Sequence, residues 1–216
     1  LLDPPNDLVA RHRRRPLDAF AGERGEVAPA QRRVFVADED FALGGHDDRR
    51  DVAIVRRHDE YVANLLSKQI TAPADPNRRN FPHDFGIFFA GSPAGIIDAC
   101  VAALLCPQSK HFGSSDLKTR IRLAAGWMER NQLPSGNFDL PTTNFNSTPD
   151  TGFITHSLAA AALLARQGGL TEVSALIEPI LRKMAGALAA GGVHTPNHRW
   201  VVCEALAQMY ELFKDA

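Results

Sequence analysis

The fold is decided by two apolar segments, IIDACVAALL at residues 96–105 and LAAAALL at residues 158–164. A helix that is apolar around most of its circumference is buried, whereas a helix with a charged stripe faces water. Neither segment reaches the roughly 20 apolar residues that a transmembrane helix needs. The two segments therefore predict buried core helices of a soluble, all-α domain.

Four further helices are expected around these two, from the spacing of apolar residues and from Ser/Thr-Pro starts. The third, fourth and fifth helices should be separated by a polar loop at 134–147 and by Gly168-Gly169. Pro179 lies inside the fifth helix and should kink it. The six expected helices span about 49–70, 92–106, 114–131, 148–168, 171–191 and 195–213.

The second, fourth and sixth helices begin with Ser or Thr followed by Pro and are the more apolar ones, whereas the others are more charged. Alternating outer and inner helices, repeated about every 50 residues, are typical of helical-hairpin repeats. The pattern predicts an incomplete (α/α) toroid or α/α solenoid arc, and a plain six-helix bundle also explains it. In an arc, the inner helices run parallel with their N-termini at one end, where positive helix ends suit an anionic ligand.

Two domains are expected: an irregular N-terminal arm over 1–47 and the helical-hairpin domain over 48–216. The net charge of −1 and the pI of about 6.8 favour neither nucleic acid nor a membrane surface as a partner. Cys100, Cys106 and Cys203 should be buried, reduced thiols. The histidine spacing contains no metal-binding motif, so we expect neither a metal nor a cofactor.

Polar residues that could carry chemistry gather at the starts of the fourth and sixth helices. The first group comprises Asn144, Asn146, Asp150 and His156, and the second comprises His194, Asn197, His198, Arg199 and Trp200. Buried polar groups are costly without partners, so two such groups at corresponding helix starts favour a binding or catalytic site. Alternatively, Thr148, Asp150 and Thr195 are plain helix caps, and His156 and Trp200 are core residues.

Paired helices with an Asn-His pair opening an inner helix, in Thr195-Pro196-Asn197-His198-Arg199-Trp200, resemble the toroid domain of heparinase II/III-like and alginate lyase type polysaccharide lyases. The resemblance covers about residues 49–216. It implies that Asn197 and His198 neutralise a uronate carboxylate, so that a base can remove the C5 proton and β-elimination follows. Six helices are half of such a twelve-helix ring, so a second chain or a missing C-terminal half should complete it.

Three functions follow as hypotheses. The first is a polysaccharide lyase acting on an anionic poly- or oligosaccharide, with His156 or His194 as the base and Arg199 as a further anion partner. The second is a glycoside hydrolase that uses Asp139 and Asp150 as its carboxyl pair. The third is a non-catalytic α-solenoid that binds a glycan or a protein. The sequence does not assign a cellular compartment.

Overall fold

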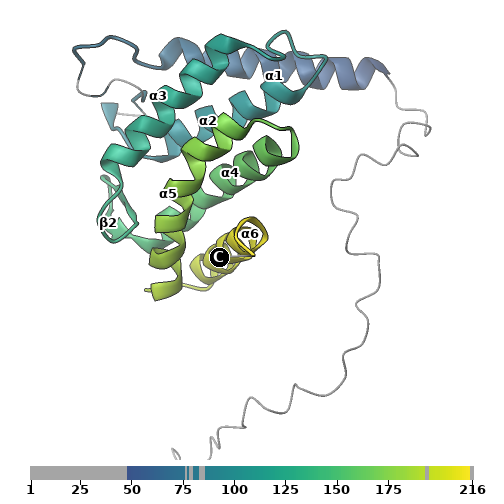
Figure 1. The fold of residues 1–216 in the computed structure, drawn as a ribbon. Coiled ribbons are helices and arrows are strands. Elements are labelled where there is room, and N and C mark those ends of the chain that lie inside the picture. The colour runs from purple at the N-terminus through teal and green to yellow at the C-terminus, as the bar shows by residue number, and fades with distance from the viewer. Residues whose placement is uncertain (1–47, 76, 78–79, 83–85, 193–194, 215–216) are drawn as a thin grey trace, which may run out of the picture. The chain divides into compact units, whose positions relative to one another are not determined.

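The computed structural model describes residues 48–75, 77, 80–82, 86–192 and 195–214, which form an all-α domain with one small hairpin (Figure 1). The expected arm at 1–47 lies outside the described residues. None of the described helices combines the length and the apolarity needed to span a bilayer. The elements are α1 (Asp48–Lys68), α2 (Gly91–Leu105), α3 (Ser115–Asn131), β1 (Phe138–Leu140), β2 (Asn144–Ser147), α4 (Thr148–Gln167), α5 (Thr171–Ala190) and α6 (Pro196–Leu212).

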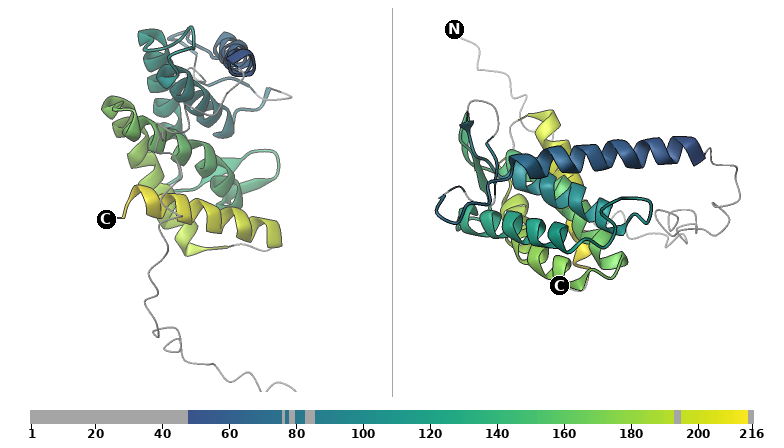
Figure 2. Two further views of the ribbon diagram at one scale, coloured as in Figure 1. Left: turned by 90° about the vertical axis from the view of Figure 1, so that its right-hand side faces the viewer. Right: turned by 90° about the horizontal axis from the view of Figure 1, so that it is seen from above.

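Helix α4 packs between α2 and α6, and the three follow one another through the stack of helices (Figure 2, left). His156 of α4 pairs with Glu204 of α6, and Arg166 at the end of α4 donates from Nη1 to the carbonyl of Leu212 at the end of α6. Both contacts join residues 46 to 48 apart, so α4 and α6 run parallel and in register. The expected parallel direction of these two inner helices is confirmed.

Helices α3 and α5 pack against each other on the outer side of α2 and α4. Lys118 Nζ lies 2.8 Å from Glu172 Oε1 near their N-terminal ends, and Gln132 Nε2 donates to the carbonyl of Ile180 further along. These two helices are therefore parallel to each other as well. Helices that carry a charged stripe face water and the more apolar helices are buried, which produces the alternation of outer and inner helices.

Of the caps expected at Ser92, Thr148 and Thr195, only Thr195 occupies the N-cap position, and none forms a side-chain cap hydrogen bond. Ser114 caps α3 by accepting from the backbone N–H of Leu117. Helix α4 is capped by Ser147 rather than by Thr148, and α2 begins one residue before Ser92, whose buried hydroxyl has no partner among the described residues. At α6, the hydroxyl of Thr195 donates to the side-chain carbonyl of Asn197 instead of capping the helix backbone.

The core is built mainly from α2, α4 and the inward faces of α3 and α5. Small residues on α4, including Ala159, Ala161 and Ala162, are fully buried and let neighbouring helices approach closely. Helix α6 was expected to be a buried inner helix, and this is wrong in part. Its buried residues lie on one face, Val202, Ala205, Met209 and Leu212, while Trp200 and Tyr210 are exposed on the other.

A loop was expected at 134–147, but residues 138–147 of it form an antiparallel β-hairpin. Phe138 pairs with Ser147, and Leu140 pairs with Asn144. The buried hydroxyl of Thr151, in the first turn of α4, accepts from the backbone N–H of Phe138 and donates to the carbonyl of Ser147. One side chain thus ties both strands to the helix, a contact that strand periodicity alone does not reveal.

The cysteines are only partly as expected. Cys100 is buried and burial raises its pKa to about 12, so this thiol is protonated and unreactive at neutral pH. Cys106 is half-buried and Cys203 is exposed, which contradicts the expectation that all three are buried. All three are free thiols.

Helix α1 is held to the α2–α3 connection by Asp59, which is 6% exposed. Its carboxylate accepts from the Ser109 hydroxyl at 2.6 Å and from the backbone N–H of Lys110 at 3.0 Å. Burial alone would raise the pKa of Asp59, but these hydrogen bonds outweigh it and the net pKa is lowered. The ionised form is therefore favoured by the folded chain.

We expect Asp59→Asn to lower the free energy of unfolding by about 1–3 kcal/mol at pH 7, because an amide nitrogen cannot accept from Lys110. Since the folded pKa is lowered, the carboxylate stabilises the fold above the ordinary Asp pKa of about 4 and loses this effect as pH falls through the folded pKa. Denaturant unfolding across pH 7 to 3 should therefore show the two proteins converging in acid. Asp51→Asn, an exposed change on the same helix, is the control. A gap that stays constant with pH would contradict this account.

We expect Gly136→Ala to destabilise the chain by about 3 kcal/mol or more, because Gly136 has φ +94° and an added Cβ would lie 2.1 Å from the Lys183 carbonyl oxygen of α5. The matched control is Gly113→Ala, which has φ +67° but open space around the added Cβ. The control should cost only about 1–2 kcal/mol, the penalty of a left-handed backbone. Equal midpoints of the two variants in thermal or denaturant unfolding would show that the turn at Gly136 does not pack closely against α5.

Candidate functional site

A pocket of about 260 Å³ lies where the start of α2, the start of α4 and the β-hairpin meet. It forms there because α4 packs beside α2 and carries the hairpin on its first turn. Small residues on α2 leave the space open, and carboxylates and aromatic rings border it. The lining residues are Phe89, Gly91, Ala94, Asp139, Leu140, Asp150, Phe153, Ile154 and Ser157.

The pocket contains two carboxylates, and each is fixed through one oxygen. Asp139 Oδ1 accepts from the backbone N–H of Asn146 at 2.6 Å. Asp150 Oδ2 accepts from the Ser147 hydroxyl and from the side-chain amide of Asn144, the latter at 3.1 Å. Among the described residues, no hydrogen bond engages Asp139 Oδ2 or Asp150 Oδ1. Two oriented carboxylates therefore keep one oxygen each for a ligand.

Asn144 and Asn146, predicted to bind substrate, brace this arrangement instead of lining the pocket. Asn146 adopts a left-handed backbone, φ 51°, which aims its N–H at Asp139. Its side-chain carbonyl accepts from the Ser135 hydroxyl and from the amide of the buried Asn137. Asparagine tolerates this backbone region better than most residues do, which is one reason for its use here.

Ser147 is the N-cap of α4 and Asp150 lies in the first turn after it, so the alternative that Asp150 is itself the helix cap is wrong. The Ser147 hydroxyl oxygen accepts from the backbone N–H of Asp150 and donates to Asp150 Oδ2. Because this contact uses Oδ2 alone, Asp150 can hold the Ser147 cap in place and present its other oxygen to the pocket.

Aromatic rings border the pocket at Phe89 and Phe153. Phe153 is half-exposed on α4, and its ring also meets the His198 ring edge-on, with centroids 6.4 Å apart. Gly91 is necessary for the position of Phe89, because an added Cβ would lie 2.3 Å from the Phe89 ring. Neither Phe89 nor Gly91 was among the residues predicted for the site.

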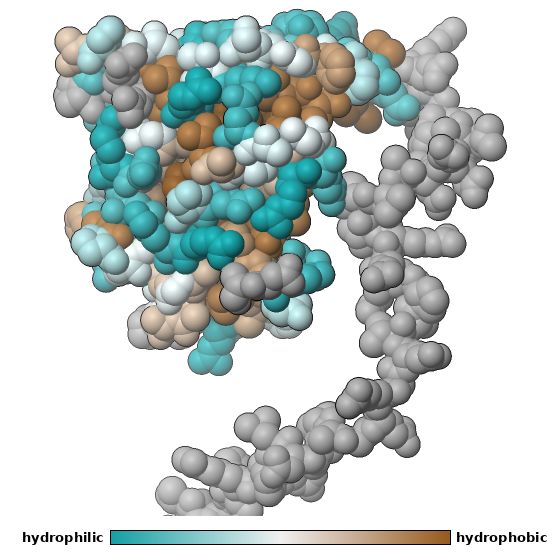
Figure 3. Space-filling view, in the orientation of Figure 1, coloured by the Kyte–Doolittle hydropathy of each residue, from teal (hydrophilic) through white to brown (hydrophobic). Residues whose placement is uncertain are grey.

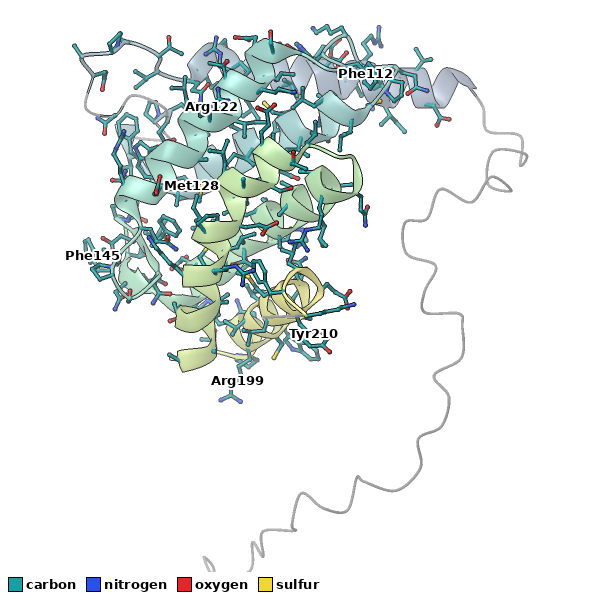
Figure 4. The ribbon with its side chains drawn as sticks, viewed as in Figure 1. Phe112, Arg122, Met128, Phe145, Arg199 and Tyr210 are labelled. Atoms are coloured by element: carbon teal, nitrogen blue, oxygen red, sulfur yellow. The ribbon has the colours of Figure 1, made fainter. Side chains whose placement is uncertain are left out.

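The residues predicted at the start of α6 do not converge on this pocket. Asn197 accepts from the Thr195 hydroxyl, and His198 lies against Phe153. Arg199 extends away from the helices, and Trp200 is 78% exposed (Figure 4). His194 lies outside the described residues.

His156 is paired with a carboxylate that the sequence did not suggest. Its Nδ1 lies 2.7 Å from Glu204 Oε1, and Gln208 Nε2 donates to the same oxygen of Glu204. With the proton on Nδ1, the other ring nitrogen is left as an acceptor or base. Because Glu204 is six residues beyond His198 on α6, this pair lies about 9 Å further along the inner helices.

Asp98 of α2 is a third acidic or basic group on the inner helices, near His156 of α4. Burial raises its pKa, and the positive charges of His156 and His58 only partly oppose this. Asp98 could have been found from the sequence, because it is the single acid within the apolar run 96–105. Glu204 could have been found less readily, from its position 48 residues after His156, which equals the distance between the starts of α4 and α6.

Over the described part of the chain, no cluster of three or more His, Cys, Asp or Glu side chains is arranged to hold a metal ion.

Comparison with known proteins assigns no function, so the function is argued from the residues of the site. No protein family, curated protein or solved structure matches the chain significantly.

Proposed function

We propose that the pocket binds a neutral oligosaccharide and that Asp139 and Asp150 hydrolyse one of its glycosidic bonds. The observation that carries this proposal is the presence in one pocket of two fixed carboxylates, each with an oxygen left over, together with the rings of Phe89 and Phe153. Carboxylate oxygens accept hydrogen bonds from sugar hydroxyls, and aromatic faces pack against the apolar faces of sugar rings.

Glycoside hydrolysis needs two carboxyl groups on either side of the scissile bond. One protonates the leaving oxygen, and the other activates a water molecule or attacks the sugar carbon directly. Asp139 comes from strand β1 and Asp150 from helix α4, so the two groups reach the pocket from different elements. Their hydrogen bonds to the hairpin hold both in place without consuming the second oxygen.

The charge of the pocket favours a neutral sugar over the anionic one that the resemblance implied. Asp139 and Asp150 would stand close to any uronate carboxylate bound there, and like charges in a partly enclosed site repel. Among the residues that line this pocket, none is a lysine or an arginine. A neutral hexose or pentose unit meets no such penalty.

The layered helices support the wider architectural proposal. Helices α2, α4 and α6 form an inner row, with α3 and α5 outside it, as in an arc of an (α/α) solenoid or an incomplete toroid. In that arrangement the starts of α2 and α4 meet at one rim with the hairpin between them. The proposed saccharide site occupies this rim.

The lyase hypothesis remains a second candidate because His156 is oriented by Glu204. A carboxylate that fixes an imidazole through Nδ1 leaves Nε2 to abstract a proton. In this reading Asn197 and His198 bind the uronate, Arg199 contributes charge, and the sugar lies along α6 rather than in the pocket. A uronate bound in this way would have to reach from the Asn197-His198 pair to His156, a distance of about 9 Å along the helices.

We expect Asp139→Asn and Asp150→Asn each to lower hydrolysis about 100-fold to 10,000-fold with little change in melting temperature. Each amide keeps a carbonyl oxygen in place of the carboxylate oxygen that holds the hairpin, so chemistry is lost while the fold is kept. The assay measures reducing ends released from neutral gluco-, xylo- and manno-oligosaccharides. Glu60→Gln, an exposed change on α1, is the matched control.

Two outcomes would contradict the hydrolase. Undiminished hydrolysis in both variants would remove the pair from the chemistry. Alternatively, polyuronate could give a product that absorbs in the ultraviolet, the mark of an unsaturated sugar, with activity lost in His156→Ala and Asn197→Ala. That result would establish the lyase instead.

Gly91→Ala is expected to weaken saccharide binding about tenfold while leaving stability within about 1 kcal/mol of the unchanged chain. The added methyl group overlaps the Phe89 ring and must displace it from the pocket. Gly95→Ala, one turn further along α2, meets no atom within 4 Å and is the matched control. Equal affinities of the two variants in calorimetric titration with the same oligosaccharides would show that Phe89 is not part of the binding surface.

A further inference from the structure

Asp98 is a half-buried carboxylate that the described part of the chain does not satisfy. Among the described residues, no hydrogen bond or ion pair engages either of its oxygens. Burial raises the pKa of Asp98, because the ionised form is deprived of water and the charges of His156 and His58 offset this only in part. The ionised carboxylate therefore lowers the stability of the folded chain. A group kept at a cost in stability is typical of a functional site.

Asp98 continues the wall of the pocket along α2. Ala94 lines the pocket, and Asp98 follows it by four residues, one turn or about 6 Å further along the same face of the helix. On α4, His156 follows Phe153 by three residues and adjoins Ser157, and both of these line the pocket. Because α2 and α4 pack against each other, Asp98 and His156 are the first ionisable groups beyond the pocket along this helix contact.

The ring of His156 is held in a fixed orientation by α6. Its Nδ1 lies 2.7 Å from Glu204 Oε1, and Gln208 Nε2 donates to the same carboxylate oxygen. With the proton on Nδ1, Nε2 is an acceptor, and no hydrogen bond from the described residues reaches it. The two helices therefore offer three acceptor atoms to a ligand: both oxygens of Asp98 and Nε2 of His156.

These acceptors suit a neutral ligand that carries several hydroxyl donors. A metal ion is the other ligand that carboxylates and imidazoles attract, but the described His, Cys, Asp and Glu side chains contain no group of three arranged to hold one. An anionic ligand would meet the charges of Asp98 and Glu204, and like charges repel. A sugar hydroxyl donates to a carboxylate or an imidazole without carrying a charge of its own.

We propose that Asp98 and His156 form a second saccharide subsite, which binds the sugar unit next to the one held in the pocket. The inference rests on the proposed function, because it takes the pocket to hold one unit of a neutral oligosaccharide. Glu204 is a positioning residue that acts through the ring of His156. The bound chain runs from the pocket along the contact between α2 and α4, so the site selects saccharides of at least two linked units.

Calorimetric titration of the full chain carrying Asp139→Asn and Asp150→Asn, which leaves the ligand uncleaved, tests the subsite. The probes are mono-, di- and trisaccharides of the gluco, xylo and manno series. We expect the disaccharide of the preferred series to bind about tenfold more tightly than its monosaccharide. Adding Asp98→Ala or His156→Ala should remove most of this gain and change the monosaccharide affinity less than about twofold. Asp98→Asn, which keeps an acceptor oxygen, should retain most of the gain.

The matched control is Asp51→Ala in the same chain. Asp51 is an exposed acid on the N-terminal half of α1, beside Val52 and Ile54, which are 60% and 65% exposed in the apolar surface of that half-helix (Figure 3). This variant should keep the whole gain.

The melting temperature separates binding from a structural role. Because the ionised form of Asp98 is unfavourable in the fold, Asp98→Ala should leave the melting temperature unchanged or higher. A clear fall in the melting temperature would show that Asp98 serves the fold, and it would overturn the proposal.

The binding results distinguish the subsite from the hydrolase. A disaccharide that binds no more tightly than its monosaccharide would overturn the subsite, as would a gain that survives Asp98→Ala or His156→Ala. If the unchanged chain then still hydrolyses oligosaccharides, the proposed function stands without the subsite. A gain that both variants remove, with no hydrolysis by the unchanged chain, would support the subsite and contradict the hydrolase. The absence of binding to every saccharide would overturn both.

Discussion

The candidate site depends on the buried hydroxyl of Thr151. This single group accepts from Phe138 on one strand and donates to Ser147 on the other, so it fixes the hairpin to the first turn of α4. A buried hydroxyl that bonds two backbone groups is costly to replace, since its loss removes both hydrogen bonds at once. The positions of Asp139 and Asp150 relative to each other follow from this attachment, because one belongs to the hairpin and the other to the helix.

The second requirement is that α4 approach its neighbours closely. Gly152, Ala159 and Ala162 are buried on the side that receives α6, and a side chain at Gly152 would collide with Val201. This proximity puts His198 against Phe153 and Glu204 against His156. The arrangement of polar groups along the inner helices is thus a consequence of small residues in α4, which themselves take no part in chemistry.

The helices could be predicted from sequence because apolar periodicity and glycine or proline boundaries act over a few residues. The extent of α3 and α5 and the parallel direction of α4 and α6 were obtained in this way. The hairpin was missed because its strands are only three and four residues long, too short for the alternation of apolar and polar residues to stand out. Phe145 of β2 is exposed, and the hydroxyl of Thr151 binds both strands. Caps at Ser92 and Thr148 were wrong for a related reason: the Ser/Thr-Pro pattern locates a helix start only to within a residue or two.

For the candidate site, the sequence supplied Asp139 and Asp150 as a pair but not the pocket that they share. Phe89 precedes α2 and reaches the pocket only because Gly91 makes room for its ring, a steric relation with no sequence pattern. Glu204 was missed because its partner His156 lies 48 residues away, and pairings of that kind depend on how helices pack. Conversely, the sequence grouped Asn144 and Asn146 with Asp150, and the structure adds that these two asparagines donate hydrogen bonds to Asp150 and Asp139.

The Ser147–Asp150 contact and the attachment of the hairpin through Thr151 join residues only 3 to 13 positions apart. The chain closes very short loops to form them, whereas the contacts between α4 and α6 close loops of nearly 50 residues. The entropy lost on loop closure grows with loop length, so the contacts that orient the two carboxylates cost less entropy to close than the contacts that join α4 to α6.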